Sequence, residues 1–149
     1  MTKNIPQFGE VEAGADYILR PGAYLVTRNG SGEIGVAETP RGFFLPGGGQ
    51  NGDETLEQAA IREAVEECGL YVQILHRLGV ADELVWSASE GTHFRKRCTF
   101  FSAKYIRNEG PHETDHELVW LPADTAPTGL THKSQAWAVT LELNNAREF

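Results

Sequence analysis

Residues 48–70 read GGQNGDETLEQAAIREAVEECGL, the stretch of this chain that says most about its fold. Thr55 followed by Gln58 three residues later is the pattern of a helix capping box. Gly69 follows the last apolar position and suits the left-handed conformation that often ends a helix. Pro46 and the glycines before Thr55 predict a loop. The segment therefore predicts a glycine-rich loop that leads into one helix between Thr55 and Gly69.

The predicted helix has an apolar stripe and an acidic side. At about 100° per residue, the buried stripe is expected to contain Ile61, Ala64, Val65 and Cys68. Glu63, Glu66 and Glu67 fall on the opposite side, where the ordinary interpretation is a solvated surface. However, like charges four residues apart repel, and the macrodipole disfavours anions near a helix C-terminus. A hard divalent cation such as Mg²⁺ reverses both penalties, so the helix predicts a metal site.

The spacing of this segment resembles a family signature. It matches the Nudix box, GX5EX7REUXEEXGU with U aliphatic, at every fixed position: Gly48, Glu54, Arg62, Glu63, Glu66, Glu67 and Gly69. The resemblance implies an α+β protein with the Nudix fold, an α/β/α sandwich with a mixed central β-sheet. It also implies hydrolysis of a nucleoside diphosphate linked to another group X, in which water attacks phosphorus with Mg²⁺ or Mn²⁺ as cofactor.

The resemblance also implies roles for individual residues. The carboxylates of Glu63, Glu66 and Glu67 and the carbonyl of Gly47 correspond to metal ligands, and Arg62 and Glu54 correspond to residues that orient the glutamates. The general base varies within the family; Glu66 and Glu63 rank ahead of an acid from a later loop. In that loop Glu113 and Glu117 are candidates, and Glu117 is preferred as the additional metal ligand.

The rest of the chain predicts more strands than helices. Alternating or continuous apolar runs indicate strands, and a run of turn formers at 29–32 indicates a hairpin. The expected strands cover residues 18–20, 23–27, 34–36, 43–45, 72–86 (as one or two strands), 92–105 and 118–121, and a last helix covers 133–144. A single domain over residues 1–149 is expected.

Composition limits the class of protein. Of 149 residues, 40% are hydrophobic and 23% charged, which is typical of a soluble folded chain. The absence of a membrane span or secretory signal favours the cytoplasm, and Cys68 and Cys98 are expected to be packed thiols. A net charge of -8 argues against nucleic acid as a partner. It is compatible with a phosphorylated small molecule when divalent cations lie between the two.

Two other motifs suggest competing functions. Gly47, Gly49 and Gly52 match GxGxxG, but the helix starts only at Thr55 and no second βαβ unit follows, which disfavours dinucleotide binding. Residues 112–116 read HETDH, the HExxH pattern of zinc proteases, which requires a helix. Pro111 and the strand expected from residue 118 argue against that helix. A Nudix domain that binds a nucleotide without cutting it is a third alternative.

Residues outside the box select the substrate. Arg20, Arg28, Arg95 and Arg97 are candidates to bind phosphates. Trp86, Phe94 and Phe43 are candidates to stack a base. A nucleoside triphosphate, cut to monophosphate and pyrophosphate, is preferred because a compact chain with no N-terminal extension leaves little room for a second subsite. A dinucleoside polyphosphate or a nucleotide sugar is the alternative, and the family resemblance is compatible with a homodimer.

Overall fold

A computed structural model describes residues 4–147. Within them, eight strands form one sheet in the order β1-β6-β7-β2-β3-β4, with β5 on β2 and β8 on β3. The strands are β1 (Gln7–Phe8), β2 (Tyr17–Arg28), β3 (Ile34–Thr39), β4 (Gly42–Phe44), β5 (Gly47–Gly49), β6 (Leu70–Ser87), β7 (Thr92–Asn108) and β8 (Glu117–Leu121). The pairs β1–β6 and β2–β7 are parallel and the others antiparallel, so the predicted mixed sheet is confirmed.

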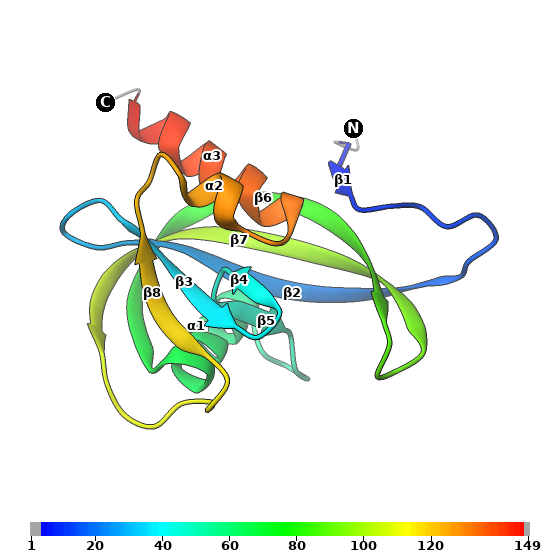
Figure 1. The fold of residues 1–149 in the computed structure, drawn as a ribbon, viewed down its shortest axis with the longest axis horizontal. Coiled ribbons are helices and arrows are strands. Elements are labelled where there is room, and N and C mark those ends of the chain that lie inside the picture. The colour runs from blue at the N-terminus through cyan, green and yellow to red at the C-terminus, as the bar shows by residue number, and fades with distance from the viewer. Residues whose placement is uncertain (1–3, 148–149) are drawn as a thin grey trace.

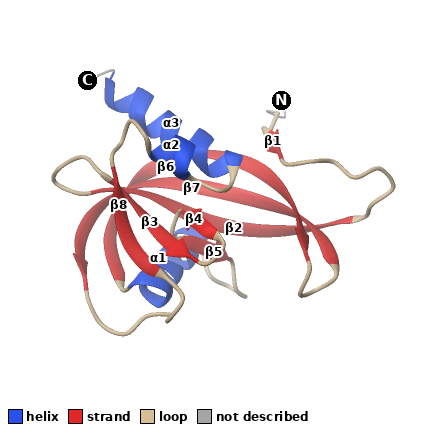
Figure 2. Ribbon diagram, in the orientation of Figure 1, coloured by secondary structure: helices blue, strands red, loops and turns tan. Residues whose placement is uncertain are grey.

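Helices cover both faces of this sheet (Figures 1 and 2). Helix α1 (Leu56–Cys68) lies on one face, and α2 (Ala126–Gly129) and α3 (Lys133–Arg147) lie on the other. Successive side chains of a strand point to opposite faces. In β2, Ala23 and Leu25 therefore join the core beneath α1, whereas Tyr24 and Val26 join the core beneath α3. These two cores give the expected α/β/α sandwich.

Helix α1 begins and ends as predicted, but a different face of it is buried. Thr55 forms the capping box with Gln58, and Gly69 has φ 61°. The buried residues are Ala59, Ala60, Ala64 and Cys68. Ile61, expected in the buried stripe, is 40% exposed, and Val65 is only half-buried. The small alanines let α1 lie close to the sheet. Compared with the predicted orientation, the helix is rotated about its axis, and Glu63 and Glu67 are partly buried as a result.

The glycine cluster is the second correction. Residues 47–49 form strand β5, which pairs with β2, rather than a loop. A Cβ on Gly47 would lie 2.2 Å from the carbonyl oxygen of Ala23, and one on Gly48 would lie 2.7 Å from the side chain of Glu63. Glycine therefore permits β5 to fit between β2 and α1, a tertiary contact that local turn propensity does not report.

Smaller differences concern element boundaries. The two strands expected at 18–20 and 23–27 are the continuous strand β2, 72–86 is the single strand β6, and the last helix extends to Arg147. The short elements β1 and α2 were not predicted. None of the described helices is long and apolar enough to cross a membrane.

Candidate active site

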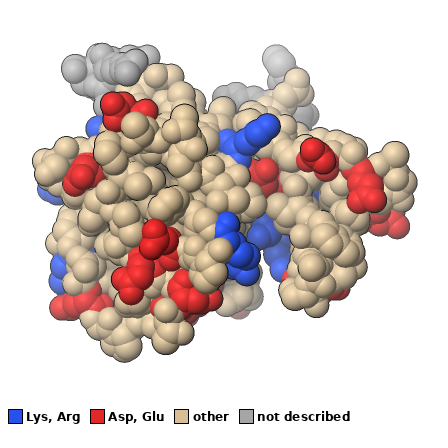
Figure 3. All heavy atoms as spheres, in the orientation of Figure 1, with Lys and Arg blue, Asp and Glu red and all other residues tan. Residues whose placement is uncertain are grey.

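A cleft of about 880 Å³ lies between α1 with β5, the start of α3, and the hairpin that joins β6 to β7. Figure 3 shows basic side chains gathered around a hollow in this face of the molecule. Glu63 and Glu67 line the wall that α1 supplies, next to Gly47, Gly48 and Gly49 of β5. The volume lies within the range common for ligand sites. A compact chain was expected to leave little room for a second substrate subsite. A cleft of this volume does have that room, so size alone does not restrict the substrate.

Arg62 organises the acidic side chains of α1. Its Nε and Nη2 donate to the two carboxylate oxygens of Glu54 at 2.5 and 3.0 Å, and Nη2 also donates to the carbonyl of Gly49 at 3.1 Å. Its Nη1 donates to Glu63 at 2.9 Å and to Glu66 at 3.1 Å. The hydrogen bond from Arg62 lowers the pKa of Glu54. One guanidinium therefore ties the loop before α1 to two of the candidate metal ligands.

Glu67 is a carboxylate in an unfavourable position. Only 16% of its side chain is exposed, and burial is the main reason that its pKa rises to about 8. The N–H of Gly47 donates to it at 3.1 Å and opposes that rise, whereas the negative charges of Glu63, Glu113 and Glu66 add to it. Burial likewise raises the pKa of Glu63. A cation that entered such a site would lower its free energy by neutralising the buried negative charge.

The loop after β7 brings further polar groups to Glu67. The N–H of Glu113 donates to the carbonyl of Glu66 at 3.0 Å and holds the loop on the end of α1. His116, which lines the cleft, has its Nε2 3.9 Å from Glu67 and its Nδ1 2.8 Å from Asp115. Glu113, Asp115 and His116 can converge on one metal ion. The sequence did not predict that His116 belongs to this site, because its only distinguishing feature there was its place in the HExxH pattern.

The donor set fits Mg²⁺ or Mn²⁺. Hard divalent cations take carboxylate and carbonyl oxygens, and Glu63, Glu66 and Glu67 supply several within one turn of helix. Their mutual repulsion and the burial of Glu67 are the penalties that a cation would relieve. The assignment of these residues as ligands, with the carbonyl of Gly47, stays a prediction. Glu117 is exposed at the start of β8, opposite Glu38 of β3, and does not line the cleft.

Of the side chains predicted to bind substrate, three line the cleft: Arg20, Trp86 and Phe94. Four do not: Arg28, Phe43, Arg95 and Arg97. Arg20 lies over the ring of Phe94, 3.9 Å from its centroid. Arg28 lies 3.1 Å from Glu142 of α3. Phe43 packs into the core beneath α3, and its neighbour Phe44 lines the cleft instead.

Arg95 and Arg97 share one strand face, as expected, but their common partner is an acid. Arg97 donates to Asp82 at 2.9 and 3.0 Å, and Arg95 donates to it at 3.3 Å. Burial raises the pKa of Asp82, but the hydrogen bonds from the two arginines outweigh it, so the pKa is lowered. Arg95 also donates to Gln7, and this hydrogen bond links β7 to β1. This face is opposite the one that carries Lys96, which lines the cleft.

The two rival motifs do not have the structures that their functions require. Residues 112–116 contain no helix, so His112 and His116 do not share a helical face as in an HExxH zinc site. The glycines of GxGxxG belong to strand β5 and the loop after it instead of opening directly into a helix. Zinc proteolysis and dinucleotide binding of the Rossmann type therefore lose their structural basis.

Comparison with known proteins identifies the family. The NUDIX domain family matches residues 17–141, so this chain belongs to the Nudix family. Nudix hydrolases generally act on pyrophosphate bonds and use divalent metals.

Individual relatives agree with that assignment. The chain is similar to the chloroplastic Nudix hydrolase 21 of Arabidopsis thaliana, 39% identical over 61 residues, which cover 38% of this chain and 31% of that protein. A second relative, from Mycobacterium tuberculosis, is 30% identical over 95 residues, which cover 62% of this chain and 38% of that protein. The chain thus spans about a third of the length of these relatives.

Solved structures share the fold. A NUDIX hydrolase from Nitrosomonas europaea superposes with a TM-score of 0.67 at 18% identity, covering 85% of this chain and 89% of that one. A MutT NUDIX hydrolase from Burkholderia pseudomallei gives 0.62 at 28% identity, covering 83% and 97%. The Nudix fold expected from the box is therefore confirmed.

Proposed function

We propose that this chain is a Mg²⁺- or Mn²⁺-dependent pyrophosphohydrolase that cleaves a phosphoanhydride bond of a nucleotide. A nucleoside triphosphate, cut to monophosphate and pyrophosphate, is one candidate beside dinucleoside polyphosphates and nucleotide sugars, because the cleft has room for each of them. The observation that carries the proposal is the acidic wall that α1 gives to a large cleft: Glu63 and Glu67 line it, and Arg62 joins Glu63 to Glu66, which lies outside the lining. Glu67, forced into a buried position, is the strongest single sign that this group serves a cation.

The residues would divide the reaction between them. A bound divalent cation would shield the phosphate charge and lower the pKa of the attacking water. Glu66 or Glu63 would accept a proton from that water as its oxygen attacks phosphorus and the bridging P–O bond breaks. Arg62 and Glu54 would hold these carboxylates in place. Arg20 and Lys96, on the opposite side of the cleft, would bind the phosphate oxygens.

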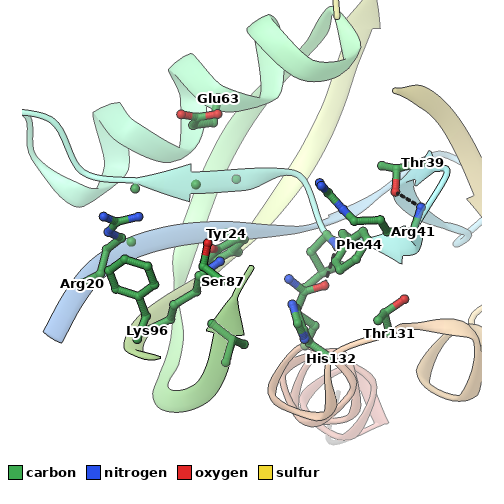
Figure 4. Close-up of a pocket in the computed structure, with 18 of the residues that line it drawn as sticks. Arg20, Tyr24, Thr39, Arg41, Phe44, Glu63, Ser87, Lys96, Thr131 and His132 are labelled. Carbon is green, nitrogen blue, oxygen red and sulfur yellow. Dashed lines mark hydrogen bonds between the residues drawn. The ribbon is translucent and has the colours of Figure 1, made fainter. Parts of the chain in front are cut away.

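A substrate panel tests the reaction. Purified protein is incubated with Mg²⁺ or Mn²⁺ and nucleoside triphosphates, nucleotide sugars and dinucleoside polyphosphates, and released phosphate and pyrophosphate are measured. The second and third groups are included because the residues that line the cleft lie on both sides of Glu63 (Figure 4). We expect release of pyrophosphate or of two phosphorylated products from at least one compound, and none in EDTA.

Three variants identify the acids that act. Glu66→Gln should lower kcat on the order of 10²-fold or more, as expected for a general base or metal ligand. Glu57→Gln is the matched control, because Glu57 is exposed in the first turn of the same helix. Glu113→Gln should have the smaller effect. Greater loss with Glu113→Gln would move the base to the later loop, and no product from any compound would favour a domain that binds nucleotides without cutting them.

A further inference from the structure

A second cavity, of about 380 Å³, lies where the segment between β1 and β2 passes the hairpin that joins β6 to β7. Figure 1 shows this segment, in dark blue, running out beyond the sheet before it turns back into β2. We call the cavity the N-terminal pocket and define it by five of the side chains that line it: Glu10, Glu12, Tyr17, Trp86 and His93. Of these five, only Trp86 also lines the active-site cleft. The N-terminal pocket is therefore a separate cavity that shares one side chain with the cleft.

A row of three rings forms part of this pocket. Tyr17 of β2 and Trp86 of β6 both pair with His93 of β7, which lies between them, so the three side chains share one face of the sheet. The ring centroids of Tyr17 and His93 are 5.2 Å apart, and those of Trp86 and His93 are 4.6 Å apart. Trp86 is 57% exposed, although tryptophan is highly buried on average. The row thus ends in an aromatic face that is open to a ligand.

Acidic side chains complete the pocket. The N–H of Glu12 donates to the hydroxyl oxygen of Tyr17 at 3.0 Å, and the carboxylate of Glu12 lies 3.2 Å from Nε2 of His93. These two contacts hold Glu12 beside the rings. Glu10, two residues earlier, is exposed and lines the same pocket. The described residues that line the pocket include no lysine or arginine. Negative charge and aromatic surface therefore occur together here.

This combination limits the chemistry of a ligand. Two carboxylates repel phosphates and other anions, and a net charge of -8 attracts cations from a distance. A bare metal ion is disfavoured, because within residues 4–147 neither Glu10 nor Glu12 belongs to a group of three side chains that could converge on one ion. Aromatic rings attract organic cations, and tryptophan attracts them most strongly. The volume is at the lower end of the range for small-molecule sites.

We infer that the N-terminal pocket binds a small organic cation that carries an alkylated ammonium group. The methyl groups of such a cation contact the ring of Trp86, while Glu10 and Glu12 balance its charge. An alkylated ammonium suits this pocket better than a bare one, because an unsubstituted ammonium is strongly hydrated and gains less from contact with a ring. The inference is independent of the proposed function, since four of the five defining residues lie outside the active-site cleft.

Choline chloride, titrated into ¹⁵N-labelled protein at low ionic strength, tests the inference by nuclear magnetic resonance. The indole N–H signal of Trp86, identified by its loss in Trp86→Leu, should shift as choline is added. The neutral compound of the same shape, 3,3-dimethylbutan-1-ol, should bind about tenfold or more weakly. Sodium chloride at the same concentrations should not reproduce the shift.

Three results would overturn the inference. Equal affinity for the neutral alcohol would mean that the pocket recognises apolar shape only. An equal response to sodium chloride would mean that only the acidic surface responds. Absence of any shift with choline would mean that the pocket does not bind this class of cation.

Variants locate the cation. Trp86→Leu keeps apolar bulk but removes the ring, so the affinity for choline, followed through the backbone amide of His93, should fall about fivefold. Glu10→Gln should weaken binding about threefold by removing an exposed ion pair. Glu90→Gln is the matched control and should leave the affinity unchanged, because Glu90 lies in the same hairpin and lines the cleft but not the N-terminal pocket. All three side chains are exposed, so the core is left intact. Weaker binding in Glu90→Gln but not in Glu10→Gln would place the cation in the cleft and refute the site.

Discussion

Removing the charge of Glu67 should stabilise the metal-free protein. Burial raises the pKa of this side chain from 4.5 to about 8. A raised folded-state pKa means that folding favours the protonated form: its contribution to stability is full below pH 4.5 and is lost as the pH rises toward 8. Each pH unit in this window changes the free energy by about 1.4 kcal/mol, so the wild type should lose about 3 kcal/mol between pH 4.5 and pH 7 through Glu67 alone.

The Glu67→Gln variant isolates this effect. The amide side chain keeps an oxygen for the N–H of Gly47 but cannot ionise. In EDTA, urea denaturation should give the variant and the wild type the same free energy of unfolding near pH 4.5. At pH 7 the free energy of unfolding of the variant should be higher by about 3 kcal/mol. Saturating Mg²⁺ should reverse the order at pH 7, because the cation stabilises the ionised wild type and has lost a ligand in the variant.

The control is Glu57→Gln, which removes an exposed carboxylate from the first turn of the same helix. It should leave the pH dependence of unfolding close to that of the wild type. If the Glu67→Gln variant follows the wild type between pH 4.5 and pH 7 in EDTA, Glu67 does not titrate in this window and the assigned burial effect is wrong. If Mg²⁺ stabilises both proteins equally, Glu67 is not a metal ligand.

Three further perturbations have defined outcomes. Arg62→Lys removes the forked hydrogen bonds of the guanidinium and should lower kcat/KM on the order of 10²-fold. Its free energy of unfolding in urea should stay close to that of the wild type. Unchanged kinetics would refute the role of Arg62 in positioning the glutamates. Asp82→Asn should lower the free energy of unfolding in urea at pH 7 by about 2 kcal/mol, because Asp82 loses charge-assisted hydrogen bonds that Arg95 and Arg97 donate to it, while kcat stays unchanged. Because the pKa of Asp82 is lowered, this difference should vanish only below about pH 4. Gly48→Ala would place a Cβ 2.7 Å from the Glu63 side chain, so it should lower both the melting temperature and Mn²⁺ affinity measured by electron paramagnetic resonance.

Much of the fold was readable from the sequence because local rules are strong here. The capping box at Thr55, the left-handed Gly69 and the long β-prone runs act over a few residues, and each appears where it was expected. The spacing of the box from Gly48 to Gly69 was sufficient to predict the α/β/α sandwich. Its match, however, says nothing about which face of α1 meets the sheet.

Tertiary packing decided the rest. Helical periodicity relates side chains only to one another, and hydrophobicity favoured Ile61 and Val65 for the buried side. In the structure the alanines of α1 form the buried side instead, because α1 packs closely against the sheet that includes β5. The same orientation buries most of Glu67. The candidate arginines illustrate the same point. The sequence does not show which acid an arginine will contact, because that depends on how the strands pair, and pairing of β6 with β7 places Asp82 next to Arg97.

The sequence by itself determined the family, the acidic helix and the chemistry that its glutamates suit, because these depend on spacing along one segment. Only the tertiary structure decided that Phe44 instead of Phe43 lines the cleft, and that His116 and Gln135 lie within it. The physical reason is that a cleft is made by elements far apart in the chain. Which side chain faces it depends on strand register and helix rotation, and these are fixed only when the layers pack together.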